Sequence, residues 1–336
     1  MPIPKAIVLT AFLIATTASL TARAHEYSTQ TEARSQTQAK AITLKDDLGR
    51  RVTLHQPAER IAAASPAAVD LLLSLDITPV TRPWLPGRTP ETWSEIPVIG
   101  FDHASGPNLE QLIAADPDLI IIDVTSARFI DRLESLVGAP VFVLQVSDIA
   151  GLPERLRTLG RASGNIDDAR KHANRVETML DAVRTEHQSA APARVVALFG
   201  GPRTSYAFTP GSYVGSLVEL VGAELVLAGG KPHGLFPELG RYSPEQVWAA
   251  DPDVILVLSH GAVHDRLPSL RADPSWASLR AVRDGRVRTL SDDLFVMRPG
   301  ADFAAAISKL LAAIDGTPAD VNSTKSELAE AGEGRE

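Results

Sequence analysis

The residues best suited to binding a ligand lie in short stretches that contain glycine or proline. Their side chains are basic, imidazole or aromatic, and the candidates are Arg82, Trp84, His103, Arg203, Tyr206, His260, Phe295 and Arg298. Arginine holds anionic groups through paired hydrogen bonds, and aromatic rings line the apolar faces of a ligand. Aromatic residues beside proline or glycine also pack loops, so each has a structural alternative. His260 and His264 could share a helical face and bind a divalent metal, but no further His, Asp or Glu cluster accompanies them.

Two carboxylates stand at the start of a motif that the chain repeats. EQLIAADPDLIII begins at Glu110, and EQVWAADPDVILV begins at Glu245. In each copy a helix that stops at Asp-Pro leads into an apolar strand, which is the joint of an α/β repeat. Exposed carboxylates at equivalent places on two similar units would suit a two-fold symmetric partner. The alternative is a solvated residue near a helix N-terminus, where negative charge is favourable.

Apolar runs alternate with amphipathic segments along most of the chain. Strands are expected over residues 60–64, 78–81, 119–123 and 141–146, and helical patterns accompany them. Continuous apolar strands between helices favour a parallel sheet covered on both faces. The alternation restarts after Pro192 and runs from RVVALFGG to a last strand near VRTLSDDL. The expected fold class is α/β, with two Rossmann-like lobes built on parallel-rich sheets.

One long helix is expected between the lobes, over residues 166–188. Its apolar positions recur at three and four residues and are Ala169, Ala173, Val176, Leu180 and Val183. Asn165 is placed to cap the helix, and no glycine or proline interrupts it before Pro192. Such a helix spans roughly 30 Å and could join the lobes rigidly. An ordinary surface helix would show the same pattern.

The N-terminus has the pattern of an export signal. Lys5, a short apolar stretch and TARA ending at Ala24 predict a secretory signal peptide cleaved after Ala24. A membrane anchor is the alternative, although the apolar run is short for a span. The chain has no cysteine, which excludes disulfides and a diacylated lipoprotein anchor. From the export signal and the absence of cysteine we expect a soluble periplasmic protein. A formal net charge of −8 disfavours nucleic acid as a partner.

A chain of 336 residues is longer than one hydrophobic core usually supports, which favours two lobes. The expected division is a signal peptide over residues 1–24, a flexible leader over 25–41, an N-terminal α/β lobe over 42–164, an inter-lobe helix over 165–191, a C-terminal α/β lobe over 192–315 and a disordered tail over 316–336.

With these motifs in order, the chain resembles the substrate-binding proteins of bacterial iron-siderophore, haem and cobalamin ABC importers, the class III type with a helical spine. The motifs are ITLKDDLGRRVTLHQPAERIAAASP, NLEQLIAADPDLIIID, SPEQVWAADPDVILVL and LRAVRDGRVRTL, and the likeness covers roughly residues 42–314. The resemblance implies a ligand in the cleft between the lobes, limited closure and delivery to an ABC permease dimer. It also implies that Glu110 and Glu245 dock onto arginines of that permease.

The second half of the chain also looks like the haem-binding lipoprotein of the iron-regulated surface determinant system. The likeness rests on GGPRTSYAFTPGSYVGSLVELVGA, DPDVILVLSHGAVHD and LSDDLFVM. It implies that His260 is an axial ligand of haem iron. The matching first-lobe methionine falls in a loop that offers His103 instead, and haem iron accepts two imidazoles. The arginines would then hold the propionates, and the aromatic residues would line the macrocycle.

Haem is therefore the expected ligand, as transported cargo and not as a catalytic cofactor. A ferric hydroxamate siderophore is the alternative, because its iron is already saturated and Arg, Tyr and Trp contacts would suffice; cobalamin is a third possibility. A periplasmic enzyme is disfavoured, since the chain has no GxSxG elbow, no cysteine nucleophile and no His-rich metal motif. We expect a monomer that binds and does not catalyse.

Overall fold

The computed structural model describes residues 41–85, 89–102, 104–188, 190–200, 206–227, 232–233, 236–259 and 274–316. The predicted signal peptide, almost all of the leader and almost all of the tail lie outside the described residues. No helix of the described part is long and apolar enough to cross a membrane.

The elements before residue 165, which we call the first half, surround a small parallel sheet. They are β1 (Ile42–Lys45), β2 (Arg51–Leu54), β3 (Ile61–Ala63), α2 (Pro66–Leu73), β4 (Arg82–Pro83), η1 (Glu91–Trp93), β5 (Val98–Ile99), β6 (Phe101–Asp102), β7 (Gly106–Pro107), α3 (Leu109–Ala115), β8 (Leu119–Ile122), η2 (Val124–Phe129), α4 (Ile130–Val137), β9 (Val141–Val143) and α5 (Leu152–Ser163). Strands β3, β8 and β9 pair in parallel in that order.

One predicted strand of the first half is not formed as expected. Residues 78–80 are outside any strand, and Thr81 makes only an isolated bridge to Ala62. Pro79 lies in this run, and proline has no N–H to donate to a strand ladder.

The elements after residue 191, which we call the second half, surround a larger mixed sheet. They are β10 (Arg194–Phe199), β11 (Tyr206–Phe208), α7 (Tyr213–Leu220), β12 (Glu224–Leu225), β13 (Pro232–His233), β14 (Phe236–Arg241), α8 (Pro244–Ala250), β15 (Val254–Ser259), α10 (Pro274–Ala277), α11 (Arg280–Arg283), β16 (Val287–Ser291), η4 (Asp293–Met297) and α12 (Phe303–Asp315). In the described residues, the strand order is β13-β14-β11-β10-β15-β16, and β12 also pairs with β10. Strands β10, β12, β15 and β16 are parallel, while β11 is antiparallel to both of its neighbours.

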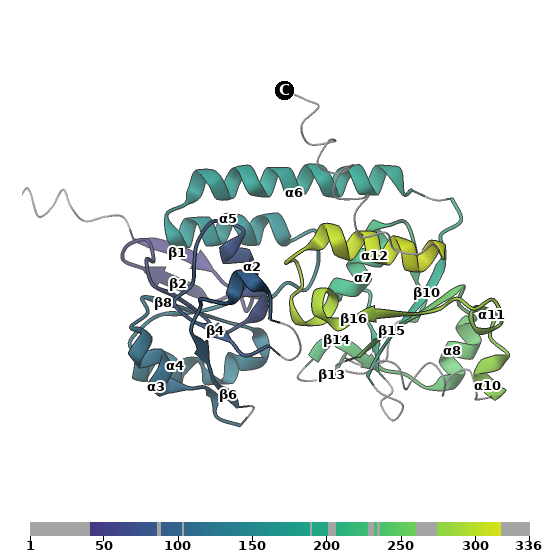
Figure 1. Ribbon diagram of the computed structural model, residues 1–336, viewed down its shortest axis with the longest axis horizontal. Helices are drawn as coiled ribbons and strands as arrows, with labels where there is room; N and C mark the ends of the chain where they lie inside the picture. The colour runs from purple at the N-terminus through teal and green to yellow at the C-terminus, as the bar shows by residue number, and fades with distance from the viewer. Residues whose placement is uncertain are drawn as a thin grey trace, which may run out of the picture.

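The expected long helix is α6 (Ile166–Glu186), an unbroken helix of 21 residues. All five of its predicted apolar positions are buried. Figure 1 shows α6 lying across the top of the molecule, above α5 of the first half and above α7 and α12 of the second. The Asn165 side chain does not cap the helix as expected, because its amide donates to the Leu75 carbonyl oxygen at 2.9 Å.

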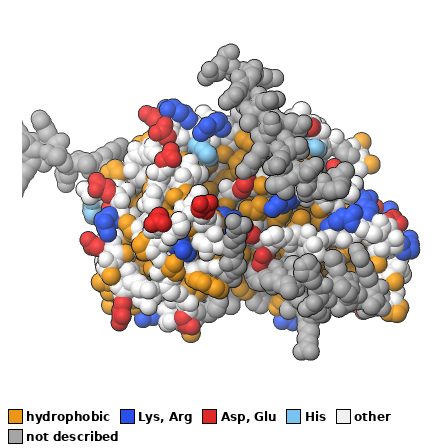
Figure 2. Space-filling view, viewed as in Figure 1, with side chains coloured by type: hydrophobic (Ala, Val, Ile, Leu, Met, Phe, Trp, Pro, Cys, Tyr) orange, Lys and Arg blue, Asp and Glu red, His pale blue; other side chains and the backbone are white. Residues whose placement is uncertain are grey.

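One cluster of buried apolar side chains extends through both halves and α6. It includes Leu119 of β8, Leu180 of α6 and Leu256 of β15. The two halves therefore share a continuous core beneath the helix. Figure 2 shows acidic and basic side chains interspersed over the face in view, with apolar side chains between them.

Candidate ligand cleft and docking helices

The carboxyl edge of the larger sheet is where a ligand of an open α/β fold is expected. The register aligns one row of residues along this edge: Arg241, Tyr206, Phe199, Leu258 and Leu290. Tyr206 is half-buried and Arg241 is exposed, and the Arg241 guanidinium carbon lies 5.8 Å from the centre of the Tyr206 ring. An aromatic ring and a cation thus stand together at the expected ligand edge.

Polar contacts join the two halves next to this sheet. The Gln145 side-chain amide donates to Glu238 Oε1 on β14 at 2.8 Å. The Ile149 backbone N–H donates to Ser216 Oγ on α7 at 2.9 Å. Burial raises the pKa of Glu238, and the hydrogen bond from Gln145 opposes that rise. The segment after β9 is therefore fastened to the edge of the second half's sheet.

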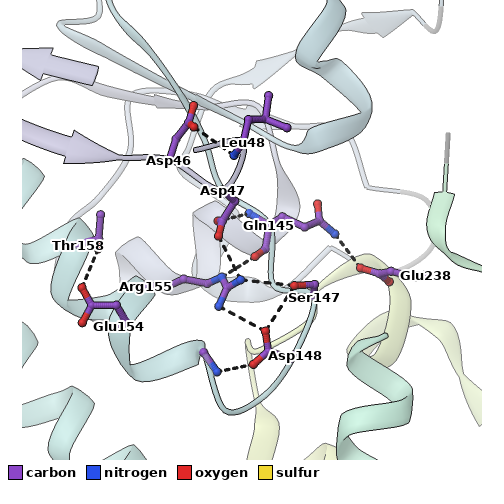
Figure 3. Close-up of polar contacts among 11 residues, drawn as sticks. Asp46, Asp47, Leu48, Gln145, Ser147, Asp148, Glu154, Arg155, Thr158 and Glu238 are labelled. Carbon is purple, nitrogen blue, oxygen red and sulfur yellow. Dashed lines mark hydrogen bonds and ion pairs between the residues drawn. The ribbon is translucent and has the colours of Figure 1, made fainter. Parts of the chain in front are cut away.

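Figure 3 shows how Arg155 of α5 fixes this segment. Its guanidinium donates to the Gln145 carbonyl oxygen and to Asp47 Oδ1, the latter at 3.1 Å. Asp47 in turn accepts the Gln145 backbone N–H at 2.8 Å. Because its backbone is held at both polar groups, Gln145 presents its side chain to Glu238. The sequence interpretation missed Gln145, Arg155 and Glu238, since no local pattern marks a contact between distant segments.

Arg298, predicted to bind ligand, is occupied by carboxylates of both halves. It donates to Asp293 through Nε and Nη2 at 2.7 Å each, and to Asp70 Oδ2 through Nη1 at 2.9 Å. Trp93 Nε1 donates to the other oxygen of Asp70 at 2.8 Å. Hydrogen bonds to Asp293 raise the pKa of Arg298, while burial raises the pKa of Asp70 despite the neighbouring guanidinium. Arg298 thus forms a bridge between the halves.

Two further residues that were predicted to bind the ligand are buried in the structure. Arg82 is 9% exposed, and its guanidinium donates to the backbone carbonyl oxygens of Trp93 at 3.0 Å and Ile96 at 3.1 Å. Phe295 is 1% exposed within the core, because η4 turns it inward. Neither side chain offers a surface to a ligand. Trp84, in contrast, is 65% exposed directly after β4.

The three remaining predicted ligand residues, His103, Arg203 and His260, lie outside the described residues, as does His264. Among the described residues there is no group of three or more His, Cys, Asp or Glu side chains that could hold a metal ion.

The two repeated motifs form α3 and α8, and each carries its acidic residue in the exposed first turn. Asn108 caps α3 by accepting the Gln111 N–H at 3.0 Å, and Ser243 and Gln246 form a capping box at α8. Glu110 and Glu245 are both exposed. Hydrogen bonds from the Ser243 side chain and the local backbone lower the pKa of Glu245.

The Asp-Pro-Asp that follows each helix has the same structural role in both halves. Asp116 and Asp251 end the helices in the left-handed conformation, with φ of 46° and 36°. An arginine at the start of the neighbouring strand then binds the helix C-terminus: Arg60 Nη2 donates to the Ala115 carbonyl oxygen at 2.5 Å, and Arg194 Nη2 to that of Ala250 at 2.7 Å.

The second aspartate of each motif closes the joint. Asp118 accepts the backbone N–H of Arg60 at 3.0 Å, and Asp253 accepts that of Arg194 at 2.9 Å. The repeat is therefore a duplicated joint that holds each helix, with its glutamate, against the sheet of its own half. The sequence interpretation recognised the repeat but missed both arginines, which stand about 55 residues before their carbonyl partners.

A family model described as periplasmic binding protein matches residues 61–294 of this chain. The chain belongs to the periplasmic binding protein family.

Several curated proteins are similar to it. A cobalamin-binding protein of Halobacterium salinarum is 28% identical over 233 residues, which are 67% of this chain and 60% of that protein. A vitamin B12-binding protein of Salmonella typhi is 28% identical over 202 residues, or 60% of this chain and 72% of that protein. The high-affinity heme uptake system protein IsdE of Staphylococcus aureus is 22% identical over 258 residues, or 75% and 85%. This chain thus spans less than two thirds of the length of the Halobacterium protein.

Solved structures show the same fold. An ABC transporter substrate-binding protein from Listeria monocytogenes superposes with a TM-score of 0.68 at 22% identity, covering 78% of this chain and 100% of that one. S. aureus IsdE complexed with heme superposes with a TM-score of 0.65 at 20% identity, covering 76% and 98%. The predicted α/β fold class is confirmed.

Proposed function

We propose that this protein is an extracytoplasmic solute-binding protein that captures an iron compound and delivers it to an ABC permease, with haem as the first candidate for that compound. One observation carries the proposal: two equivalent helices, one in each half of a periplasmic-binding-protein fold, present an exposed glutamate. A permease with two-fold symmetry would meet such a pair with equivalent surfaces. The signal-like stretch that ends at Ala24 supports export to the periplasm.

The ligand would lie between a lobe over residues 42–164 and a lobe over residues 192–315, joined by the helix over 165–191. Trp84 and Tyr206 have exposed or half-exposed rings that suit the face of a macrocycle. His260 and His103 would supply the axial imidazoles, and Arg203 would hold an anionic group. The shared core beneath α6 supports a small closing movement rather than a wide hinge.

Cobalamin is the second candidate, because two relatives that are 28% identical are named as cobalamin- or vitamin B12-binding proteins. A ferric hydroxamate siderophore would use the same cleft without any iron ligand from the protein.

Titration of the purified protein with hemin tests the proposal. We expect a sharp Soret band that His260→Ala weakens. His55→Ala is the control and should leave the band intact, because His55 is an exposed residue directly after β2 in the first half. An unchanged hemin spectrum, together with tight quenching of tryptophan fluorescence by cyanocobalamin or a ferric trihydroxamate, would assign the alternative ligand.

A further inference from the structure

The arginines predicted to hold an anionic ligand are largely committed elsewhere. Arg82 is buried and its Nε donates to backbone carbonyl oxygens, and Arg298 is bound by Asp70 and Asp293. A ligand with carboxylates would therefore need a different cation in the described part of the cleft. Arg241, on the last residue of β14, meets this need.

Arg241 is exposed, and no ion pair joins it to a carboxylate of the described residues. Its guanidinium carbon lies 5.8 Å from the centre of the Tyr206 ring. A guanidinium beside an aromatic ring keeps its charge, and N–H donors remain for a planar anionic group. An exposed arginine that pairs with no carboxylate in the described part of the chain is available for a ligand at little desolvation cost.

The backbone at Arg241 is fixed by the sheet. Its strand partner is Tyr206, and Tyr206 pairs in turn with Phe199, the last residue of β10. The next residue, Tyr242, is buried at 8% exposure. The register therefore places this cation at the carboxyl edge, where the fold locates ligands, and the neighbouring strand and the buried tyrosine hold it there.

We infer that Arg241, held beside Tyr206, binds an anionic oxygen group of the ligand. The inference rests on the proposed function and narrows it, because it requires a ligand that carries a carboxylate at its periphery. A haem propionate and a carboxylate siderophore share this chemistry. A cobalamin has neutral amide side chains and no carboxylate, and its single anionic oxygen group is the phosphodiester of its nucleotide loop.

Equilibrium binding to matched pairs of charged and neutral ligands tests this inference. The pairs are hemin with hemin dimethyl ester, and a ferric carboxylate siderophore with a neutral ferric trihydroxamate; cyanocobalamin completes the panel. For the charged ligand that binds, we expect Arg241→Gln to raise the Kd roughly 10- to 100-fold, the range for hydrogen bonds to charged groups. The neutral partner should change by less than about threefold, and Arg241→Lys should give an intermediate loss.

Arg51→Gln is the matched control, because Arg51 is an exposed arginine on β2 and its loss alters the net charge equally. Circular dichroism verifies the fold of each variant. Equal weakening of both members of a pair, or no weakening, would overturn the inference and leave the proposed function intact. Binding of cyanocobalamin alone would overturn the requirement for a ligand carboxylate and the preference for haem. If the wild-type protein binds none of the panel, the proposed function itself fails.

Discussion

The ion-paired bridge between the halves gives the sharpest stability prediction. The Arg298 and Asp70 side chains are 12% and 11% exposed, and Asp293 is 40% exposed. Arg298→Met keeps the apolar stem but leaves the Asp70 carboxylate with the neutral Trp93 N–H as its one side-chain donor among the described contacts. Removing one partner of a buried pair costs about 3–5 kcal/mol, and the better solvated Asp293 lowers this. We therefore expect Arg298→Met to lower the free energy of unfolding by roughly 2–4 kcal/mol.

Urea unfolding with linear extrapolation measures this loss. Asp70→Leu combined with Arg298→Met removes both charges, so the double variant should be more stable than Arg298→Met alone by about 1–2 kcal/mol. Arg184→Met is the control, because Arg184 pairs with Asp181 at 2.6 Å on the exposed surface of α6, where the effect should stay below about 1 kcal/mol. If Arg298→Met costs no more than Arg184→Met, the bridge does not stabilise the arrangement of the halves.

Three other perturbations test separate parts of the structure. Burial raises the pKa of Glu238, so the contribution of this carboxyl to the free energy of unfolding falls as pH rises from the ordinary pKa of 4.5 through the raised pKa of the folded state. In unfolding measured as a function of pH, Glu238→Gln should remove this fall. The same substitution at the exposed Glu219 should leave it in place. Gly160→Ala would place a Cβ 2.2 Å from the Ala169 Cβ, between α5 and α6. This clash should lower the free energy of unfolding in urea by about 1–3 kcal/mol. Gly211→Ala is the control, because its Cβ would meet nothing within 4 Å, and it should change stability by less than about 1 kcal/mol. Reversing Glu110 and Glu245 to arginine should abolish uptake in cells and leave ligand affinity unchanged, with Glu186→Arg on α6 as the control; lost affinity would contradict the docking assignment.

Local patterns predicted the parts of the fold that depend on local order. The period of Ala169, Val176 and Leu180 belongs to a helix wherever it packs, so α6 followed from the sequence. The duplicated Asp-Pro-Asp likewise marked two equivalent joints, because a left-handed helix end followed by proline is encoded within a few residues.

Contacts between distant segments could not be predicted in the same way. Asp70 and Arg298 are 228 residues apart, and Gln145 and Glu238 are 93 apart. An arginine that binds carbonyl oxygens, as Arg82 does, has the same sequence signature as one that binds a ligand. Phe295 resembled a cleft residue until its burial in the core was known. Arg241 could not be singled out within its loop, because its place on the carboxyl edge depends on strand register.

The structure of the protein loaded with hemin would test the central claim most directly. We predict that the macrocycle lies between the two halves at the carboxyl edge of the larger sheet, beside Tyr206, with its iron bonded to His260. Hemin bound on an outer face, or an empty cleft in crystals grown with saturating hemin, would contradict the account.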